Sequence, residues 1–380
     1  MNNGYYLSVL GAGQEIGSSC YSLDIGGHTL LLDCGRSVKN GFLCGPDFTC
    51  LLCRNKSPKD IENIFISHAH YDHIGYLSDV FKQCGKVPIY TSRLTVELGK
   101  VLLWDNYSSK NFKMSFSKFE QYKNDLNGAI ASVNKCEFNK PIDFGSYKVT
   151  FYEAGHIPGA SMIYIETSSR KILFTGDFSI EPTMLTNGSI LPEGLTADTL
   201  IIDGTFAKRP GFHNYSMFEK SLSCLREVAF APISVRVSQL TKGIETLRLI
   251  LEKMKNGDIP QCRVYIDETL WNVAQAFINV GIQVLQENCF LFKGKNVNSR
   301  EKAIYITTSG IGNIQEFNLD YSLHAGFDDL KAFINRYATD QVVVVHSPNA
   351  REFTDKYSLE DSCDPKLNFI YPETGETYLI

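Results

Sequence analysis

Three histidines and an aspartate fall within six consecutive positions, at His68, His70, Asp72 and His73. The apolar residues Ile64-Phe65-Ile66 precede them and predict the end of a buried strand. Alternation along that strand would place His68 and His70 on one face, and the next turn would bring Asp72 and His73 back towards them. Imidazole and carboxylate groups suit zinc, and four of them in one turn can serve two ions. With only 8 histidines in 380 residues, a metal site is favoured over a polar surface loop.

The same arrangement, an apolar strand that ends in an aspartate or a histidine, recurs along the chain at Asp33, His156, Asp177, Asp203 and His346. A single aspartate after a strand is usually a turn residue. Several such residues around one mouth of a β scaffold would instead complete a metal site. Asp33 is the candidate for a carboxylate that orients a metal ligand through a hydrogen bond.

The elements that must position these residues differ between two parts of the chain. Residues 206–308 alternate strand and helix, which predicts a small parallel α/β domain. The flanking parts are predicted as strand-rich, with a closing hairpin at Phe369 to Ile380. The glycines from Gly11 to Gly17 lie between two predicted strands with the wrong spacing for a dinucleotide fingerprint, so an NAD site is rejected. Thr91 to Ile130 is predicted as mostly helical, with no role assigned to 105–125.

The composition is that of an ordinary soluble protein of two domains, with 43% hydrophobic and 21% charged residues. No apolar run approaches the ~18 residues of a membrane span, so no membrane partner is expected. The first residues lack the pattern of a signal peptide. The odd number of cysteines, 11, predicts reduced thiols and a cytoplasmic location. Cys50 and Cys53, with Cys44 upstream, are weak candidates for structural zinc, and buried thiols are favoured.

The net charge of −5 hides an asymmetry. Residues 206–308 carry 14 Lys and Arg against 9 Asp and Glu, whereas the remainder carries 23 against 33. A basic segment in an acidic protein predicts a local anionic partner, although an ordinary solvated surface explains the charge as well. The turn at Ser309 and Gly310 could offer backbone amides to a phosphate, or it could be a plain loop.

Taken together, these residues resemble the β-CASP branch of the metallo-β-lactamase superfamily. The general pattern of the superfamily is matched at Asp33, His68, His70, Asp72, His73, His156 and Asp177, and the positions specific to the branch are matched at Asp203, His324 and His346. The resemblance covers nearly the whole chain. It implies an α/β fold, a metallo-β-lactamase αββα sandwich from residues 1–205 and 309–380, with the β-CASP insert at 206–308.

The resemblance also implies roles. His68, His70 and His156 would bind one zinc ion, Asp72, His73 and His346 a second, and Asp177 would bridge the two, with manganese as an alternative metal. A hydroxide held by two metals would then hydrolyse a phosphodiester bond. Asp72 belongs to this catalytic centre, and His324, steered by Asp203, would protonate the leaving oxygen.

The substrate implied by the resemblance is RNA, most readily single-stranded, because relatives that keep the last histidine act mostly on RNA. The chain departs from its relatives in a shorter insert and in Thr241-Lys242-Gly243-Ile244-Glu245, where relatives often carry Gly-Arg-Ala-Gln-Glu. Lys242 would therefore bind phosphate as a point charge, together with Ser309 and Gly310. Ser347-Pro348 also follows His346 where Gly-Glu is common.

Three alternatives remain open at this point. A single-stranded DNA nuclease would use the same metal chemistry. A small-ester or thioester hydrolase of the wider superfamily would need neither His324 nor His346. A non-catalytic subunit of an RNA-processing complex usually loses metal ligands, and all are present here. The sequence leaves internal cleavage, cleavage from a 5′ end and assembly as a homodimer undecided.

Overall fold

A computed structural model describes residues 4–108, 116–208, 215–237, 240–294, 297, 300–318, 321, 323–358 and 366–380. The chain divides into two compact units. The large unit contains Met1–Ile180, Gly188–Phe212 and His324–Ile380, and the small unit contains Glu181–Asn187 and His213–Leu323. Among the described helices, none combines the length and the apolar character that a membrane span requires.

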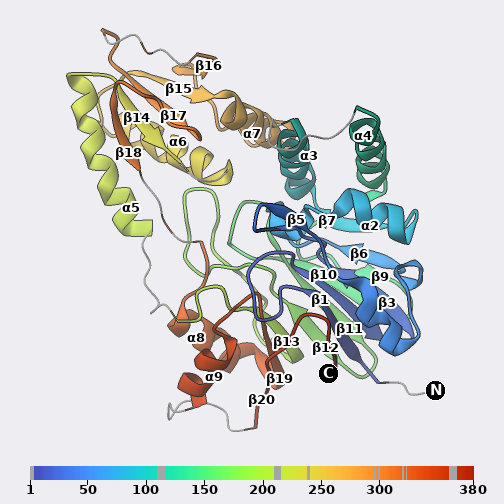
Figure 1. Cartoon of the computed structure of the whole chain (residues 1–380). Coiled ribbons are helices and arrows are strands. Elements are labelled where there is room, and N and C mark those ends of the chain that lie inside the picture. Colours follow the sequence, from blue (N-terminus) through green and yellow to red (C-terminus); the bar gives the residue numbers. More distant parts are fainter. Residues whose placement is uncertain are drawn as a thin grey trace. The chain divides into compact units, whose positions relative to one another are not determined.

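The large unit is built on two sheets (Figure 1). The strands of the first sheet are β1 (Tyr6–Gly11), β2 (Cys20–Ile25), β3 (His28–Leu32), β6 (Asn63–Phe65), β7 (Ile89–Ser92), β8 (Val133–Cys136) and β21 (Thr377–Leu379). Those of the second are β9 (Ile142–Asp143), β10 (Tyr147–Glu153), β11 (Ser161–Thr167), β12 (Lys171–Phe174), β13 (Ala197–Asp203), β19 (Ala338–Val345) and β20 (Asn368–Ile370). The orders are β21-β1-β2-β3-β6-β7-β8 and β20-β19-β13-β12-β11-β10-β9. A separate hairpin joins β4 (Ser37–Lys39) to β5 (Phe42–Cys44).

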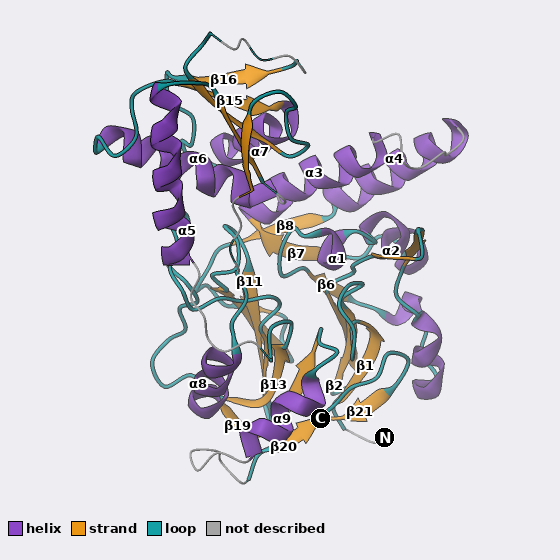
Figure 2. Cartoon of the chain, turned by 60° about the vertical axis from the view of Figure 1, so that its left-hand side comes forward, coloured by secondary structure: helices purple, strands orange, loops and turns teal. Residues whose placement is uncertain are grey.

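Helices cover the outer faces of the two sheets. They are α1 (Tyr71–Ile74), α2 (Leu77–Cys84), α3 (Arg93–Ser108), α4 (Phe116–Ala131), α8 (Phe327–Tyr337) and α9 (Ala350–Ser358), with 3-10 turns η1 (Phe48–Arg54) and η2 (Pro58–Asp60). Figure 2 shows α8 and α9 beside β13 and β19. Side chains alternate along β6, so Phe65 packs between the sheets against Phe151 and Phe174, whereas Ile64 packs with Leu77 of α2. These layers confirm the predicted αββα sandwich.

The small unit is a parallel sheet with helices, as the alternation of strand and helix predicts. Its strands are β14 (Ile233–Arg236), β15 (Arg263–Asp267), β16 (Cys289–Phe292), β17 (Ala303–Thr307) and β18 (Gln315–Asn318). Its helices are α5 (Tyr215–Ser221), η3 (Leu222–Ala229), α6 (Leu240–Lys255) and α7 (Glu268–Asn279). The order is β16-β15-β17-β14-β18, with every pair parallel. Because β18 pairs with β14, this unit continues past the predicted limit at residue 308.

Two local predictions are wrong. The residues from Phe369 to Ile380 do not form a hairpin, because β20 pairs with β19 in one sheet and β21 pairs with β1 in the other. The strand before the histidine cluster ends at Phe65, so His68 and His70 lie in a connection rather than on a strand. The segment 105–125 is helical where described, in α3 and α4, and residues 109–115 lie outside the described part.

Candidate metal centre

The histidine cluster is positioned by the start of α1. His70 is the residue before the helix, and Asp72 and His73 lie in its first turn. The backbone of this turn is fixed to the end of β3, because Cys34 N donates to His73 O at 2.8 Å and Ser19 N donates to Asp72 O at 2.7 Å. Gly35 permits this approach, since a Cβ there would clash with the carbonyl oxygen of Asp72. Tertiary contact therefore brings Asp72 and His73 back towards His68.

The predicted ligands fall into two groups in space. The potential ligand atoms of His68, His70, His156 and Asp177 all lie within 4.8 Å of one another. The same holds for Asp72, His73 and His346. The structure thus brings the segment from His68 to His73 together with His156, Asp177 and His346, in the two sets that the resemblance implies.

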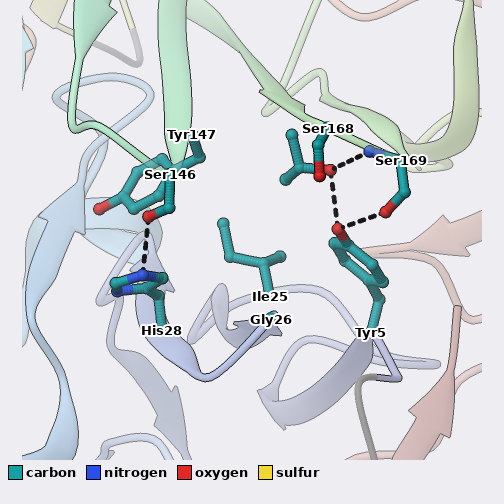
Figure 3. Close-up of a pocket in the computed structure, with 9 residues that line it drawn as sticks. Tyr5, Ile25, Gly26, His28, Ser146, Tyr147, Ser168 and Ser169 are labelled. Atoms are coloured by element: carbon teal, nitrogen blue, oxygen red, sulfur yellow. Dashed lines mark hydrogen bonds between the residues drawn. The ribbon is translucent and has the colours of Figure 1, made fainter.

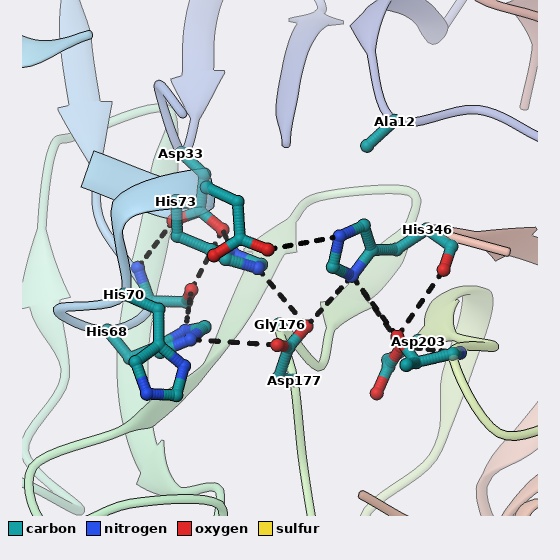
Figure 4. A network of polar contacts seen from close by, with 12 residues as sticks. Ala12, Asp33, His68, His70, His73, Gly176, Asp177, Asp203 and His346 are labelled. Atoms are coloured by element: carbon teal, nitrogen blue, oxygen red, sulfur yellow. Dashed lines mark hydrogen bonds and ion pairs between the residues drawn. The ribbon is translucent and has the colours of Figure 1, made fainter. Parts of the chain in front are cut away.

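Asp177 lies at the centre of these side chains, with His68, His70 and His73 on one side and His346 on the other (Figure 4). Its Oδ2 atom is 3.7 Å from Nε2 of His68 and 3.7 Å from Nε2 of His156. Its Oδ1 atom is 3.2 Å from Nε2 of His73 and 3.2 Å from Nδ1 of His346. One carboxylate oxygen therefore faces each group, which is the geometry that a bridging ligand requires.

The chemistry of these residues fits metal ions. The Nε2 atoms of His68, His70 and His73 are buried, and none has a hydrogen-bond partner among the described residues. Burial, reinforced by His73, lowers the pKa of His68 well below its ordinary value, and burial lowers the pKa of His70 to about 4. Both rings are therefore neutral near pH 7, and a neutral imidazole is the form that binds a metal.

Asp33 holds His73 in position. Its Oδ2 atom lies 2.7 Å from Nδ1 of His73 and accepts from Ser67 Oγ at 2.8 Å, while its Oδ1 atom accepts from Ser67 N at 2.7 Å. Because Nδ1 of His73 donates to this carboxylate, Nε2 is directed at Asp177, 3.2 Å from its Oδ1 atom. The contact is the one expected of a carboxylate that orients a metal-binding histidine.

His346 follows β19 and has two partners that the sequence did not suggest. Gly17 N donates to its Nε2 atom at 2.9 Å, and Thr205 Oγ1 lies 3.3 Å from its Nδ1 atom. Because Nε2 accepts from Gly17 N, the ring proton lies on Nδ1, which faces Asp177 Oδ1 at 3.2 Å. A metal bound at this place would replace that proton.

His324 and Asp203 form a pair at the edge of the centre. Nδ1 of His324 lies 2.9 Å from Oδ2 of Asp203, whose Oδ1 atom accepts from Thr205 N at 2.8 Å and Thr205 Oγ1 at 2.6 Å. Nε2 of His324 is 3.9 Å from Asp177 Oδ2. The side chain of His324 is 18% exposed, against 3% for Asp177. His324 is therefore the more accessible of the two to a substrate.

The residues predicted to bind phosphate lie in the small unit and do not have the expected surroundings. Lys242 is 9% exposed, and its Nζ atom lies 5.3 Å from the centre of the Tyr321 ring. At the turn formed by Ser309 and Gly310, Ile311 N donates to Glu316 Oε2 at 3.1 Å. A carboxylate therefore accepts from the amide that follows this turn, and the assignment of Ser309, Gly310 and Lys242 to phosphate binding stays a prediction.

A separate hollow of about 250 Å³ lies beside the turn between β2 and β3, the start of β10 and the turn after β11 (Figure 3). Its hydroxyl groups bond to neighbouring side chains: Tyr5 OH lies 2.7 Å from Thr167 Oγ1 and 2.8 Å from Ser169 Oγ, and Ser146 Oγ lies 2.7 Å from His28 Nε2. Its lining contains a single histidine and no carboxylate, so it is no rival metal centre.

Comparison with known proteins places this geometry in context. A family profile described as "Metallo-beta-lactamase superfamily" matches residues 13–222. A probable RNase of Methanocaldococcus jannaschii is 30% identical over 298 residues, which cover 77% of this chain and 66% of that protein. A ribonuclease of Thermus thermophilus is 29% identical over 206 residues, covering 53% of this chain and 43% of that protein.

Two further similarities extend the comparison. Integrator complex subunit 11 of Danio rerio is 30% identical over 207 residues, covering 53% of this chain and 34% of that protein. This chain therefore spans only part of the length of these relatives. A crystal structure of a protein of unknown function from Enterococcus faecalis V583 superposes with a TM-score of 0.63 and 16% identity, covering 99% of this chain and 100% of that one. This likeness concerns the fold alone.

Proposed function

Because this chain belongs to the metallo-β-lactamase superfamily, we propose that it is a ribonuclease that hydrolyses phosphodiester bonds of single-stranded RNA with two zinc ions. The observation that carries the proposal is the pair of ligand groups on either side of Asp177, each facing one of its carboxylate oxygens. Such a pair is typical of enzymes that displace phosphate esters with two metals, and manganese is the alternative metal.

Each residue of the centre has a proposed role that follows from its position. His68, His70 and His156 would hold one ion, Asp72, His73 and His346 the other, and Asp177 both. Two ions bound there would polarise a phosphoryl oxygen and make hydroxide available near neutral pH. Asp33 keeps His73 in the tautomer that presents Nε2 to the centre.

His324 is proposed as the general acid. Its Nδ1 atom donates to Asp203, which keeps the ring oriented and stabilises its protonated form. Burial alone would lower the pKa of His324, but Asp177 and Asp203 raise it above its ordinary value. A protonated imidazole at the accessible edge of the centre can give its proton to the leaving oxygen of the cleaved ester.

RNA is proposed over DNA because two of the similar proteins are named as ribonucleases. The second candidate function is a role as a subunit of a larger complex, because one similar protein is named as an Integrator subunit. All seven ligand positions are filled here, which supports catalysis over a scaffold role. A cytoplasmic location and a homodimer remain parts of the proposal.

The test uses the full chain, stripped of metal and then reloaded with zinc or manganese. Single-stranded RNA labelled at the 5′ or the 3′ end, and DNA of the same sequence, are incubated with the protein in the presence and absence of a chelator. We expect metal-dependent cleavage of RNA, and the lengths of the labelled products distinguish internal cuts from trimming at the 5′ end.

Two variants provide the controls. Asp177→Asn should abolish cleavage, whereas Asp198→Asn, on β13 and away from the ligand groups, should leave it unchanged. Cleavage of DNA alone would change the substrate class. A reloaded protein that binds metal and cleaves neither nucleic acid would overturn the nuclease proposal and leave the scaffold role and the hydrolysis of small esters.

A further inference from the structure

The hairpin of β4 and β5 presents an exposed aromatic side chain. Its turn, Asn40-Gly41, has positive φ at both residues, 52° and 79°, which is the two-residue turn that gives a tight hairpin. Phe42, directly after the turn, is 75% exposed, and Val38 is 61% exposed. The Phe42 ring is therefore open to contact by a ligand.

The register of the hairpin defines which way Phe42 faces. Phe42 is paired with Lys39, and Cys44 is paired with Ser37. Directly opposed residues share a face and alternate residues do too, so these four side chains lie on one face of the ribbon. That face is turned to the β1–β2 loop, because Ser18 Oγ donates to Ser37 Oγ at 2.8 Å.

The β1–β2 loop is also part of the metal centre. Gly17 N donates to His346 Nε2, and Ser19 N donates to the backbone of Asp72. Just before the hairpin, Arg36 N donates to the carbonyl oxygen of Tyr71 at 3.1 Å. The base of the hairpin is therefore tied to the segments that carry the ligands, and Phe42 stands on the face that is turned to the β1–β2 loop.

The charges next to Phe42 permit a nucleic acid to approach. Lys39 Nζ lies 2.5 Å from Glu15 Oε2, and both side chains are partly exposed. This ion pair offsets the negative charge of Glu15 beside the strand residue that pairs with Phe42.

We propose that Phe42 forms a nucleobase-binding subsite, in which its ring stacks on one base of the single-stranded RNA next to the phosphodiester held at the metal centre. The inference rests on the proposed function. Every base offers a flat π-face to an aromatic ring, so the subsite would grip the chain without selecting a sequence. A duplex keeps its bases stacked inside and would gain nothing from the subsite, which gives a preference for single strands.

The experiment compares Phe42→Ala, Phe42→Leu and Phe42→Trp with the wild-type protein on an RNA oligonucleotide. Phe230→Ala is the matched control, because Phe230 is 87% exposed but belongs to the small unit. A second set of substrates replaces one nucleotide at a time by an abasic residue. Thermal melts check that each variant folds, which is expected for a side chain so exposed.

For Phe42→Ala we expect KM to rise about 5- to 100-fold, the range that corresponds to one lost base–aromatic stack, with kcat nearly unchanged. Phe42→Leu should resemble Phe42→Ala, and Phe42→Trp should retain binding. One abasic position should weaken the wild-type protein to a similar extent and should have no further effect on Phe42→Ala.

Failure of the inference is distinct from failure of the proposed function. A wild-type protein that cleaves RNA, with Phe42→Ala indistinguishable from it at every substrate position, overturns the subsite alone. Equal loss with intact and abasic substrates also overturns it, and would assign Phe42 to the shape of the hairpin or to a protein contact. A wild-type protein that neither binds nor cleaves RNA removes both proposals.

Discussion

His324 and His346 both lie within 4 Å of Asp177, yet their surroundings imply opposite responses to substitution. His346 faces Asp177 Oδ1 and belongs with Asp72 and His73, so His346→Ala removes a ligand of one ion. His324 is directed by Asp203 and is the more exposed of the two, so His324→Ala removes a proton donor. We expect His346→Ala to lose a metal ion and His324→Ala to keep both ions but cleave more slowly.

The size of each effect follows from the contacts. Loss of a general acid lowers the rate about 10²- to 10⁴-fold, or roughly 2.7–5.5 kcal/mol of barrier. His324→Ala also leaves Oδ2 of the buried Asp203 without this partner, at a cost of about 1–3 kcal/mol in folding free energy. Thr205 keeps Oδ1 of Asp203 bonded, so the fold should survive.

His324→Asn provides a matched control, because its amide can donate to Asp203 but cannot transfer a proton at neutral pH. It should recover the stability lost in His324→Ala without recovering cleavage. Asp203→Asn should show a milder loss of rate, since the imidazole stays in place but is poorly oriented.

The assay combines elemental analysis of the purified variants with single-turnover cleavage of RNA. His324→Ala should retain two ions per chain and bind RNA normally, and added zinc or manganese should not rescue it. His346→Ala should retain about one ion per chain, with activity partly restored by excess metal. A His324→Ala protein that lost an ion, beside a His346→Ala protein that kept both, would refute the assignment.

Three further predictions test the surroundings. Asp33→Asn weakens the contact that orients His73, so affinity for the second ion should fall about 10- to 100-fold in competition with a chelator. Burial raises the pKa of Glu245, so the folded state binds the proton of this carboxyl group more tightly than the unfolded state does. The stabilisation from this proton is present at low pH and is lost as the pH rises above about 4.5. In denaturant melts, the free energy of unfolding of Glu245→Gln should therefore rise relative to that of the wild type between pH 4 and 7. Phe174→Ala, between the sheets, should lower the free energy of unfolding by about 3–5 kcal/mol, measured in the same way.

Much of the centre can be predicted from the sequence because each ligand follows an apolar strand or opens a helix. Strand alternation does not explain why His68 and His70 lie together, since β6 ends at Phe65. What brings the cluster together is the contact of α1 with the end of β3, through Gly35 and the backbone of Asp72. Such a contact between distant segments leaves no local periodicity in the sequence.

Other features of the chain depend on the same kind of contact. Whether the amides after Gly310 are free depends on where the Glu316 side chain turns, and whether Lys242 reaches a phosphate depends on the packing of Tyr321. Gly17 was assigned correctly to a turn between strands, but its donation to His346 depends on a residue 329 positions away in sequence. Residue type and local pattern identify the groups that could bind or catalyse, whereas tertiary packing decides which partners these groups contact.

The backbone shows where the fold supports this centre. In the described part of the chain, the non-glycine residues with positive φ are Ala12, Ser18, Asp33, Asn40, Asn55, Asn139, Asn313 and His346. Asparagine, aspartate and histidine adopt this conformation more often than other residues, whereas an alanine or a serine adopts it at a cost of roughly 1–2 kcal/mol. The four residues that are not asparagine all lie in segments that contact the metal centre, and Asp33 and His346 are themselves among its predicted residues.

The hydrogen bonds around Asp33, His346 and Ala12 show how this backbone conformation is held. Asp33 N donates to Phe65 O at 2.9 Å, and His346 N donates to Ala12 O at 2.8 Å, so each backbone is tied to a neighbouring strand or loop. Tyr21 OH also donates to Ala12 O, at 2.9 Å. Strain that is held by surrounding structure is typical of functional sites, where it fixes a side chain that relaxed backbone would point elsewhere. The same β1–β2 loop contacts both His346 and the hairpin that carries Phe42. A rigid loop would therefore hold the proposed nucleobase subsite at a fixed position relative to this metal ligand.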